Sequence, residues 1–238
     1  MMKLLPNIVA IDLAIKIKDN LIITDVHIGH EEALNRQGIL VPRFQFKDII
    51  QRLEKILSKT GKLDKIIING DLKHEFGRIS DQEWRNVLKL LDFLQKHCNK
   101  ILITKGNHDP IIKPIADKRN IEIKEQFVLE KDILILHGNK IPENLEEYKT
   151  IIIGHEHPAI SLKQGPRIEL YKCYLVGKHK RKNLIVQPSL SQVTEGSDIL
   201  RSKYLSPFLK KNLDNFSVFA VEDQIYSLGK VKEIKKLK

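Results

Sequence analysis

The sequence predicts an α/β fold with a largely parallel sheet in a single domain, and two features of the chain predict it. Short runs rich in Ile and Val alternate with amphipathic helical patterns in the first half, and crossovers of this kind join parallel strands. Five such runs end in a cluster of Gly, Asp, Asn and His residues. Open α/β sheets bind their ligands at the carboxyl ends of the strands, so we expect the functional site there.

The elements of the first half follow from the spacing of apolar residues. Apolar residues after Phe46 recur at helical spacing and stop at Gly61, which predicts a first helix. A second helix is expected over 80–97, where Ser80 and Glu83 form a capping box. Strands are expected at 8–11, 13–17 and 21–24 before the first helix, at 65–69 between the helices, and at 101–104 after the second.

The second half of the chain is richer in strands. The segment 159–187 has the alternation and the turn signals of antiparallel hairpins. A Ser-rich loop at 188–197 precedes a short helical stretch, and a hairpin at 216–228 closes the chain. We therefore expect one domain over 1–238, with its motifs in 21–157. Further strands are expected at 127–129, 133–136 and 151–153.

Charge and cysteine content narrow the class of protein. Lys and Arg outnumber Asp and Glu by 41 to 30, a formal net charge of +11 that favours a phosphate-bearing partner such as nucleic acid. An equally good reading is the charged surface of an organism that grows at high temperature. Because Cys98 and Cys173 are the only two cysteines in the sequence, we expect neither a disulfide framework nor a Cys-x-x-Cys zinc site. A reducing, cytoplasmic location is therefore expected. Neither a signal peptide nor a membrane span is expected.

The polar clusters that follow the five apolar runs hold seven of the nine histidines. They contain ligands suited to hard or borderline metals, namely carboxylate, amide oxygen and imidazole. Seven such ligands are too many for one tetrahedral zinc ion, but they suit two ions that share a carboxylate. The runs read "LIITDVHIGH" (21–30), "IIINGDLKH" (66–74), "ILITKGNHD" (101–109), "ILILHG" (133–138) and "IIIGHEH" (151–157). The candidate ligands are Asp25, His27, Asp71, Asn107, His137, His155 and His157.

Alternation along an extended chain would place neighbouring candidates together. Asp25 and His27 would face one side, as would His155 and His157, while Glu156 points away. A buried cluster of this composition is costly unless cations neutralise it. Taken singly, each residue is more simply explained as a cap or a turn. The remaining histidines, His30, His97 and His179, are expected to be structural or on the surface.

The ordered series Asp-x-His, Gly-Asp, Gly-Asn-His-Asp, His-Gly and Gly-His-x-His over 25–157 resembles the calcineurin-like metallophosphoesterase superfamily. "DVHIGHE", "GDLKHEFG" and the tail over 204–229 resemble small archaeal phosphoesterases related to SbcD nucleases. The resemblance implies a two-sheet β-sandwich flanked by helices, a four-layer αββα fold in which 159–238 completes the second sheet. The chain lacks the Asp-Arg-Gly of Ser/Thr phosphatases and an evident capping domain, which puts processive duplex degradation and an ATPase partner in doubt.

The resemblance also implies roles for individual residues. Two divalent ions would be bound, with Mn²⁺ expected and Fe, Zn or Ni as alternatives, and Asp71 would bridge them. His108 would donate a proton to the leaving group or stabilise its charge, Asp109 would orient His108, and His74 would place the substrate phosphate. One ion would be held by Asp25, His27, Asp71 and His157, and the other by Asp71, Asn107, His137 and His155.

The expected activity is hydrolysis of a phosphoester P–O bond by a metal-bridging hydroxide, most simply by a phosphodiesterase or nuclease. The alternatives are a phosphomonoesterase, a nucleotide-specific hydrolase, or an inactive binding scaffold of the same fold. The run "GKHKRK" could contact nucleic-acid phosphates, or could be only a solvated hairpin tip. No aromatic stacking platform is evident in the sequence. The cations of that run are Lys178, Lys180, Arg181 and Lys182.

Overall fold

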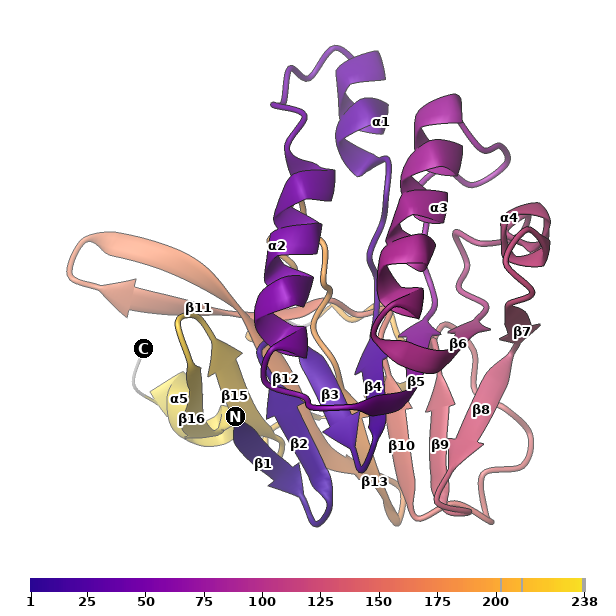
Figure 1. Ribbon diagram of the computed structural model, residues 1–238. Helices are drawn as coiled ribbons and strands as arrows, with labels where there is room; N and C mark the ends of the chain where they lie inside the picture. The colour runs from indigo at the N-terminus through magenta and orange to yellow at the C-terminus, as the bar shows by residue number, and fades with distance from the viewer. Residues whose placement is uncertain (202, 211, 237–238) are drawn as a thin grey trace.

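The computed structural model describes residues 1–201, 203–210 and 212–236, which form two mixed β-sheets packed face to face (Figure 1). The first sheet has the strand order β1-β2-β3-β4-β5-β6-β7. Its first four strands are antiparallel, and β4 to β7 are parallel. The strands are β1 (Met2–Leu5), β2 (Ile8–Ile11), β3 (Ala14–Ile17), β4 (Asn20–Ile23), β5 (Leu63–Asn69), β6 (Cys98–Thr104) and β7 (Glu122–Lys124).

The second sheet has the order β14-β11-β12-β13-β10-β9-β8, and β15 and β16 join it through β12. Strands β13, β10 and β9 are parallel to one another, whereas β12 pairs antiparallel with β11, β13 and β15. The strands are β8 (Gln126–Leu129), β9 (Ile133–Leu136), β10 (Thr150–Ile153), β11 (Pro158–Gln164), β12 (Arg167–His179), β13 (Lys182–Val186), β14 (Ser197–Asp198), β15 (Ser217–Val221) and β16 (Ile225–Lys230).

Helices cover both outer faces of this sandwich. Helices α2 and α3 lie side by side over the first sheet, with α1 beyond them (Figure 1), and the Ser80–Glu83 capping box begins α3 as the sequence predicts. The second sheet packs against α5 and the short 3₁₀ helix η1. The helices are α1 (His30–Arg36), α2 (Gln45–Leu57), α3 (Asp81–Gln95), α4 (Lys113–Asp117), α5 (Val231–Lys236) and η1 (Pro207–Leu209).

The strands of the second sheet alternate between two hydrophobic cores. In β10, Ile152 packs into the core between the sheets, whereas Ile151 and Ile153 pack into the outer core under η1 and α5. Gln187 crosses the inner layer, because its side-chain amide donates hydrogen bonds to the carbonyls of Leu13 and Ile22, each at 2.9 Å. The two sheets are therefore held by shared apolar packing and by buried hydrogen bonds.

The predicted two-sheet α/β sandwich is confirmed, but the first sheet is not largely parallel. Two-residue loops connect β1 to β2, β2 to β3 and β3 to β4, and each contains a residue with positive φ. Such loops form hairpins, so the strands they join are antiparallel. The left-handed loop residues are Asn7, Asp12 and Lys18. Among the described residues, we find no helix of the length and apolar character that a membrane span requires.

Candidate metal centre

The ends of five strands, from both sheets, meet at one edge of the sandwich. Strands β4, β5 and β6 of the first sheet and β9 and β10 of the second each end just before a predicted ligand. Buried Asn69 ties three of these ends together, because its amide donates to Leu136 O at 2.9 Å and accepts from Thr104 Oγ1 at 2.6 Å. The strand ends therefore meet around a hydrogen-bonded polar centre.

All seven predicted ligands lie in this centre, in two groups. The ligand atoms of Asp25, His27 and His157 lie within 4.8 Å of one another, and so do those of Asp71, His137 and His155. Asp71 lies between the groups, since its Oδ2 is 3.7 Å from His27 Nε2 and 3.3 Å from His137 Nε2. Asn107 Oδ1 is 3.0 Å from His137 Nε2, which places it in the second group.

The chemistry of the centre fits bound cations. Asp25 Oδ1 is buried and has no hydrogen-bond donor among the described residues. The ring nitrogens of His157 and His137 lie 3.4 and 3.6 Å from it, and His27 Nε2 faces His157 Nε2 at 3.2 Å. A buried carboxylate oxygen without a donor is costly, and a cation removes that cost. The residues present therefore fit a pair of divalent cations.

The carboxylates also change the protonation of the centre. Burial alone would lower the pKa of His137, but hydrogen bonding and charge from Asp71 and charge from Asp25 raise it to about 9. For Asp25, burial alone would raise the pKa, but the surrounding imidazoles together have the larger effect and hold that pKa below its ordinary value. The two carboxylates thus favour positive charge at His137, whereas burial lowers the pKa of His27, and lowers that of His155 to about 4.

The ligand side chains converge by a backbone conformation that the sequence did not predict. Extended alternation was expected to align them, yet five of the seven ligands have φ between 48° and 63°, in the left-handed region. Val26 still points into the core between Asp25 and His27, as alternation would require. The expected grouping is found, but the expected extended backbone is wrong. The five residues are Asp25, His27, Asp71, His155 and His157.

Two glycines allow the ligand loops to approach one another. A Cβ on Gly106 would lie 2.1 Å from Asp71 Oδ1 and 2.3 Å from the Asp71 backbone nitrogen. A Cβ on Gly154 would lie 2.0 Å from Thr24 Oγ1 and 2.5 Å from Asp25 Oδ2. Neither glycine has a positive φ, so close approach rather than turn geometry explains them.

His108 lies beside the candidate ligands, held by one hydrogen bond from its backbone and one contact of its ring. Its N–H donates to Asp71 Oδ1 at 2.8 Å, and its ring Nδ1 contacts the carbonyl oxygen of His74. The ring of Phe76 lies against the His108 ring, with centroids 3.8 Å apart, although Phe76 is 53% exposed. No motif or spacing in the sequence pointed to Phe76.

Asp109 does not orient the His108 ring as expected. Its buried carboxylate accepts hydrogen bonds of 3.2–3.3 Å from the backbone N–H groups of Leu72, Lys73 and Gly106. It therefore fixes the loop after Asp71 to the loop that carries Asn107 and His108. Its role in this structure is to position two ligand loops, because it acts on the backbone rather than on an imidazole.

His74 packs among other imidazoles at the mouth of the centre. Its ring stacks on His30 at 3.9 Å, and its ligand atom lies within 4.8 Å of those of His27 and His108. Burial and the nearby imidazoles of His30 and His108 lower the pKa of His74 to about 3. Glu83 positions this loop, since its carboxylate accepts from the N–H groups of His74 and Glu75.

Glu156 has a supporting role that sequence reasoning missed. It points away from the ligands as expected, and its buried carboxylate accepts hydrogen bonds of 2.8 Å from Leu205 N and Ser206 N. Ser206 Oγ then donates to Gly138 O, beside His137, at 2.8 Å. The segment before η1 thus connects two ligand loops.

The basic run 178–182 lies at the other end of the second sheet. In the parallel pairing of β10 and β13, Thr150 faces Asn183 and Ile153 faces Val186. The ligands follow the carboxyl end of β10, so the β12–β13 hairpin tip lies at the opposite end. Any contact of this run with nucleic acid is therefore remote from the metal ligands.

Comparison with known proteins identifies the family. A family model described as calcineurin-like phosphoesterase matches residues 21–171. The chain belongs to this family of metal-dependent hydrolases that act on phosphoester bonds, which also confirms the resemblance seen in the sequence.

Solved structures match the chain at low sequence identity, and the first of them shows the same fold. Nuclease MPE from Pseudomonas putida matches with a TM-score of 0.67 and 18% identity over 92% of this chain and 94% of that one. The phosphoesterase YfcE from E. coli matches with a TM-score of 0.44 and 18% identity over 89% of this chain and 97% of that one. A Vps29 variant from Entamoeba histolytica matches with a TM-score of 0.35 and 16% identity over 87% of this chain and 90% of that one. No curated protein sequence matches the chain.

Proposed function

We propose that the protein is a dinuclear phosphodiesterase that cleaves nucleic-acid strands, with Mn²⁺ as the expected metal. The observation that carries this proposal is the division of seven ligands into two groups that share Asp71. The mixed oxygen and nitrogen ligands support Mn²⁺, while Fe, Zn and Ni remain alternatives. The net charge of +11 and the fold shared with a nuclease support a nucleic-acid substrate.

The proposed ligand sets follow the two groups. When bound, two divalent cations lower the pKa of water and offset the negative charge of phosphoryl oxygens. Asn69, Asp109 and Glu156 would keep the ligand loops in place through their buried hydrogen bonds. Asp25, His27, Asp71 and His157 would hold one ion, and Asp71, Asn107, His137 and His155 the other.

His108 would donate a proton to the leaving oxygen. With its Nδ1 against the His74 carbonyl, its Nε2 is the ring nitrogen left for the substrate. His74, within reach of both His27 and His108, would contact a non-bridging phosphoryl oxygen. Both residues thus act on the substrate without belonging to either ligand set.

Removal of metal should abolish hydrolysis of a small diester. We expect protein treated with a chelator to lose turnover of bis-nitrophenyl phosphate, and Mn²⁺ to restore it, because the bound cations would activate the attacking water. Release of nitrophenolate measures the rate. Parallel assays with single-stranded DNA, cyclic nucleotides and a phosphomonoester separate the diesterase from the alternatives. Inactivity with Mn²⁺, Fe²⁺, Co²⁺, Ni²⁺ and Zn²⁺ alike would favour the inactive scaffold.

Substitution of His108 by alanine should slow catalysis without removing metal. General acids contribute about 10²–10⁴-fold, so we expect a loss of that order in kcat for a dinucleotide. The loss should be much smaller for a nitrophenyl diester, because nitrophenolate leaves without a proton. The exposed His97, which packs on Phe93, provides the control His97→Ala. Equal losses on both substrates, or fewer bound ions, would contradict the proton-donor role.

A further inference from the structure

Two cavities lead away from the metal centre along the second sheet. One, of about 250 Å³, is lined by the ligand His137 and by Lys105 and Lys140. The other, of about 560 Å³, is lined by the residues from His179 to Lys182 at the tip of the β12–β13 hairpin. Residues 141–143 line both cavities, so the two adjoin. Together they extend from a metal ligand to the basic run.

The connection between β9 and β10 explains this course. Because the two strands are parallel, the chain must return from the carboxyl end of β9 to the amino end of β10. Among the residues from 137 to 149 there is no helix, and this segment passes along the length of the sheet. At its far end, Lys182 Nζ donates to Glu146 O at 2.5 Å and Asn183 N donates to Lys149 O at 2.9 Å. The hairpin tip is thus fixed to the end of the groove.

The cations of the two cavities have no carboxylate partners. Five cations line the two cavities, and within the described part of the chain none of them forms an ion pair. Three carboxylates, those of Glu125, Glu143 and Glu146, also line the cavities. His179 adds a buried ring Nε2 that has no hydrogen-bond partner among the described residues. We call the five cations the basic track. They are Lys105, Lys140, Lys180, Arg181 and Lys182.

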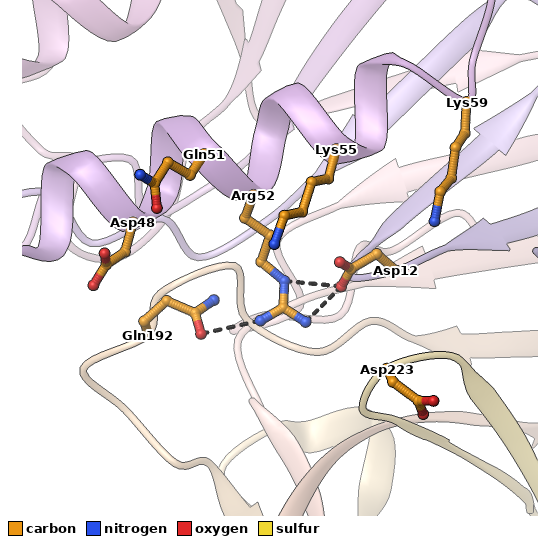
Figure 2. A pocket seen from close by; sticks show the side chains of 8 residues that line it. All are labelled: Asp12, Asp48, Gln51, Arg52, Lys55, Lys59, Gln192 and Asp223. Atoms are coloured by element: carbon orange, nitrogen blue, oxygen red, sulfur yellow. Dashed lines mark hydrogen bonds and ion pairs between the residues drawn. The ribbon is translucent and has the colours of Figure 1, made fainter.

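Another cavity shows the contrast. The pocket of about 350 Å³ beside α2 has three cations and three carboxylates in its lining, and Arg52 is paired with Asp12 at 2.6 Å (Figure 2). Arg52 also donates to Gln192 at 3.0 Å, and Lys55 on α2 and Lys59, in the turn after α2, also line the pocket (Figure 2). Its charges are balanced, so it offers no net attraction for a polyanion.

We propose that the basic track binds the phosphodiester backbone of a polynucleotide strand whose scissile phosphate lies at the metal centre. The inference rests on the proposed function and adds a preference for strand length. Along β10, from Thr150 to Ile153, the chain advances about 10 Å at strand rise, equivalent to roughly three stacked nucleotides. A strand must exceed this length to reach both the metal centre and the hairpin tip. Contacts to phosphate confer no base specificity.

The test is salt-dependent binding of a labelled single strand of roughly 15 nucleotides, in chelator so that no cleavage occurs. The variant Lys180→Asn/Arg181→Gln removes two cations, and asparagine tolerates the left-handed φ of 53° at Lys180. The logarithm of the binding constant falls linearly with the logarithm of the salt concentration, and each lost phosphate contact makes this slope shallower by about 0.7 for single strands. For the loss of two contacts, we expect the slope to become shallower by about 1.4. The ratio of kcat/KM for this strand to that for a dinucleotide should fall as well.

The matched control is Lys55→Gln/Lys59→Gln, which removes the same charge from the balanced pocket of Figure 2. We expect this variant to keep the slope and the length preference of the wild type. An unchanged slope in Lys180→Asn/Arg181→Gln, or an equal fall in both variants, would overturn the basic track. Suppose that the slope becomes shallower only in Lys180→Asn/Arg181→Gln, but that no diester is hydrolysed with any metal. The proposed function then fails, while strand binding by the basic track stands.

Discussion

Replacement of Asp71 by asparagine should lower turnover of a small phosphodiester by on the order of 10³-fold or more. The amide keeps the shape of the side chain and an acceptor for the N–H of His108, but it removes the charge that lies between both ligand groups. We expect the bound metal, measured by elemental analysis after gel filtration, to fall below two ions per chain. Both effects are expected because, in the proposed ligand sets, Asp71 would contact both ions.

The control for this substitution is Asp117→Asn, which removes an exposed carboxylate that pairs only with Lys113 on α4. It should leave turnover and metal content near wild type, because exposed ion pairs contribute little. Full activity and two ions in Asp71→Asn would show that the carboxylate does not bridge. Loss of activity with both ions retained would instead assign Asp71 to substrate positioning.

Replacement of Gly106 by alanine should damage the metal centre from the backbone side. The added methyl group would lie 2.3 Å from the Asp71 backbone nitrogen, which cannot rotate away as a flexible side chain can. Overpacking of this kind typically costs about 1–3 kcal/mol, so we expect a lower midpoint of thermal unfolding. We also expect weaker metal binding, because any relief must shift Asp71 relative to Asn107 and His137.

Gly77→Ala provides the matched control, since a Cβ at Gly77 meets no atom within 4 Å and its φ is not positive. This variant should unfold at or slightly above the wild-type temperature. Calorimetry and a metal titration on both variants compare the two sites directly. A Gly106→Ala protein with wild-type metal affinity would mean that the two ligand loops separate without consequence, contrary to the close packing described above.

The sequence predicted which polar residues lie together better than it predicted the path of the chain. The ligands were recognisable because each apolar run ends in residues that are costly to bury unless they bind something. The antiparallel start of the first sheet was not recognised, because buried parallel and antiparallel strands have the same Ile-rich composition. A signal was present, however: only two residues separate the strands at Asp12-Leu13 and at Lys18-Asp19, too few for a crossover.

Other features of the site left no trace in the sequence. The hydrogen bond from Ser206 N to the Glu156 carboxylate joins residues that are 50 positions apart in the sequence. Asp109 accepts hydrogen bonds from backbone N–H groups, which most residue types at positions 72, 73 and 106 would supply. Phe76 resembled an ordinary loop residue until its ring was found against His108. Contacts of this kind depend on tertiary packing, so neither periodicity nor motif spacing predicts them.

The left-handed backbone at five ligands has a consequence for how this chain can evolve. Residues other than glycine are strained in that conformation, at a cost of order 1 kcal/mol or more each, and Asp, Asn and His adopt it more readily than most. Under the proposed function, metal binding would keep Asp25, His27, Asp71, His155 and His157 in this conformation at the expense of stability. A descendant freed from catalysis would gain stability by drifting to glycine or asparagine at these positions. In related chains, such drift would mark lost activity before the fold itself changed.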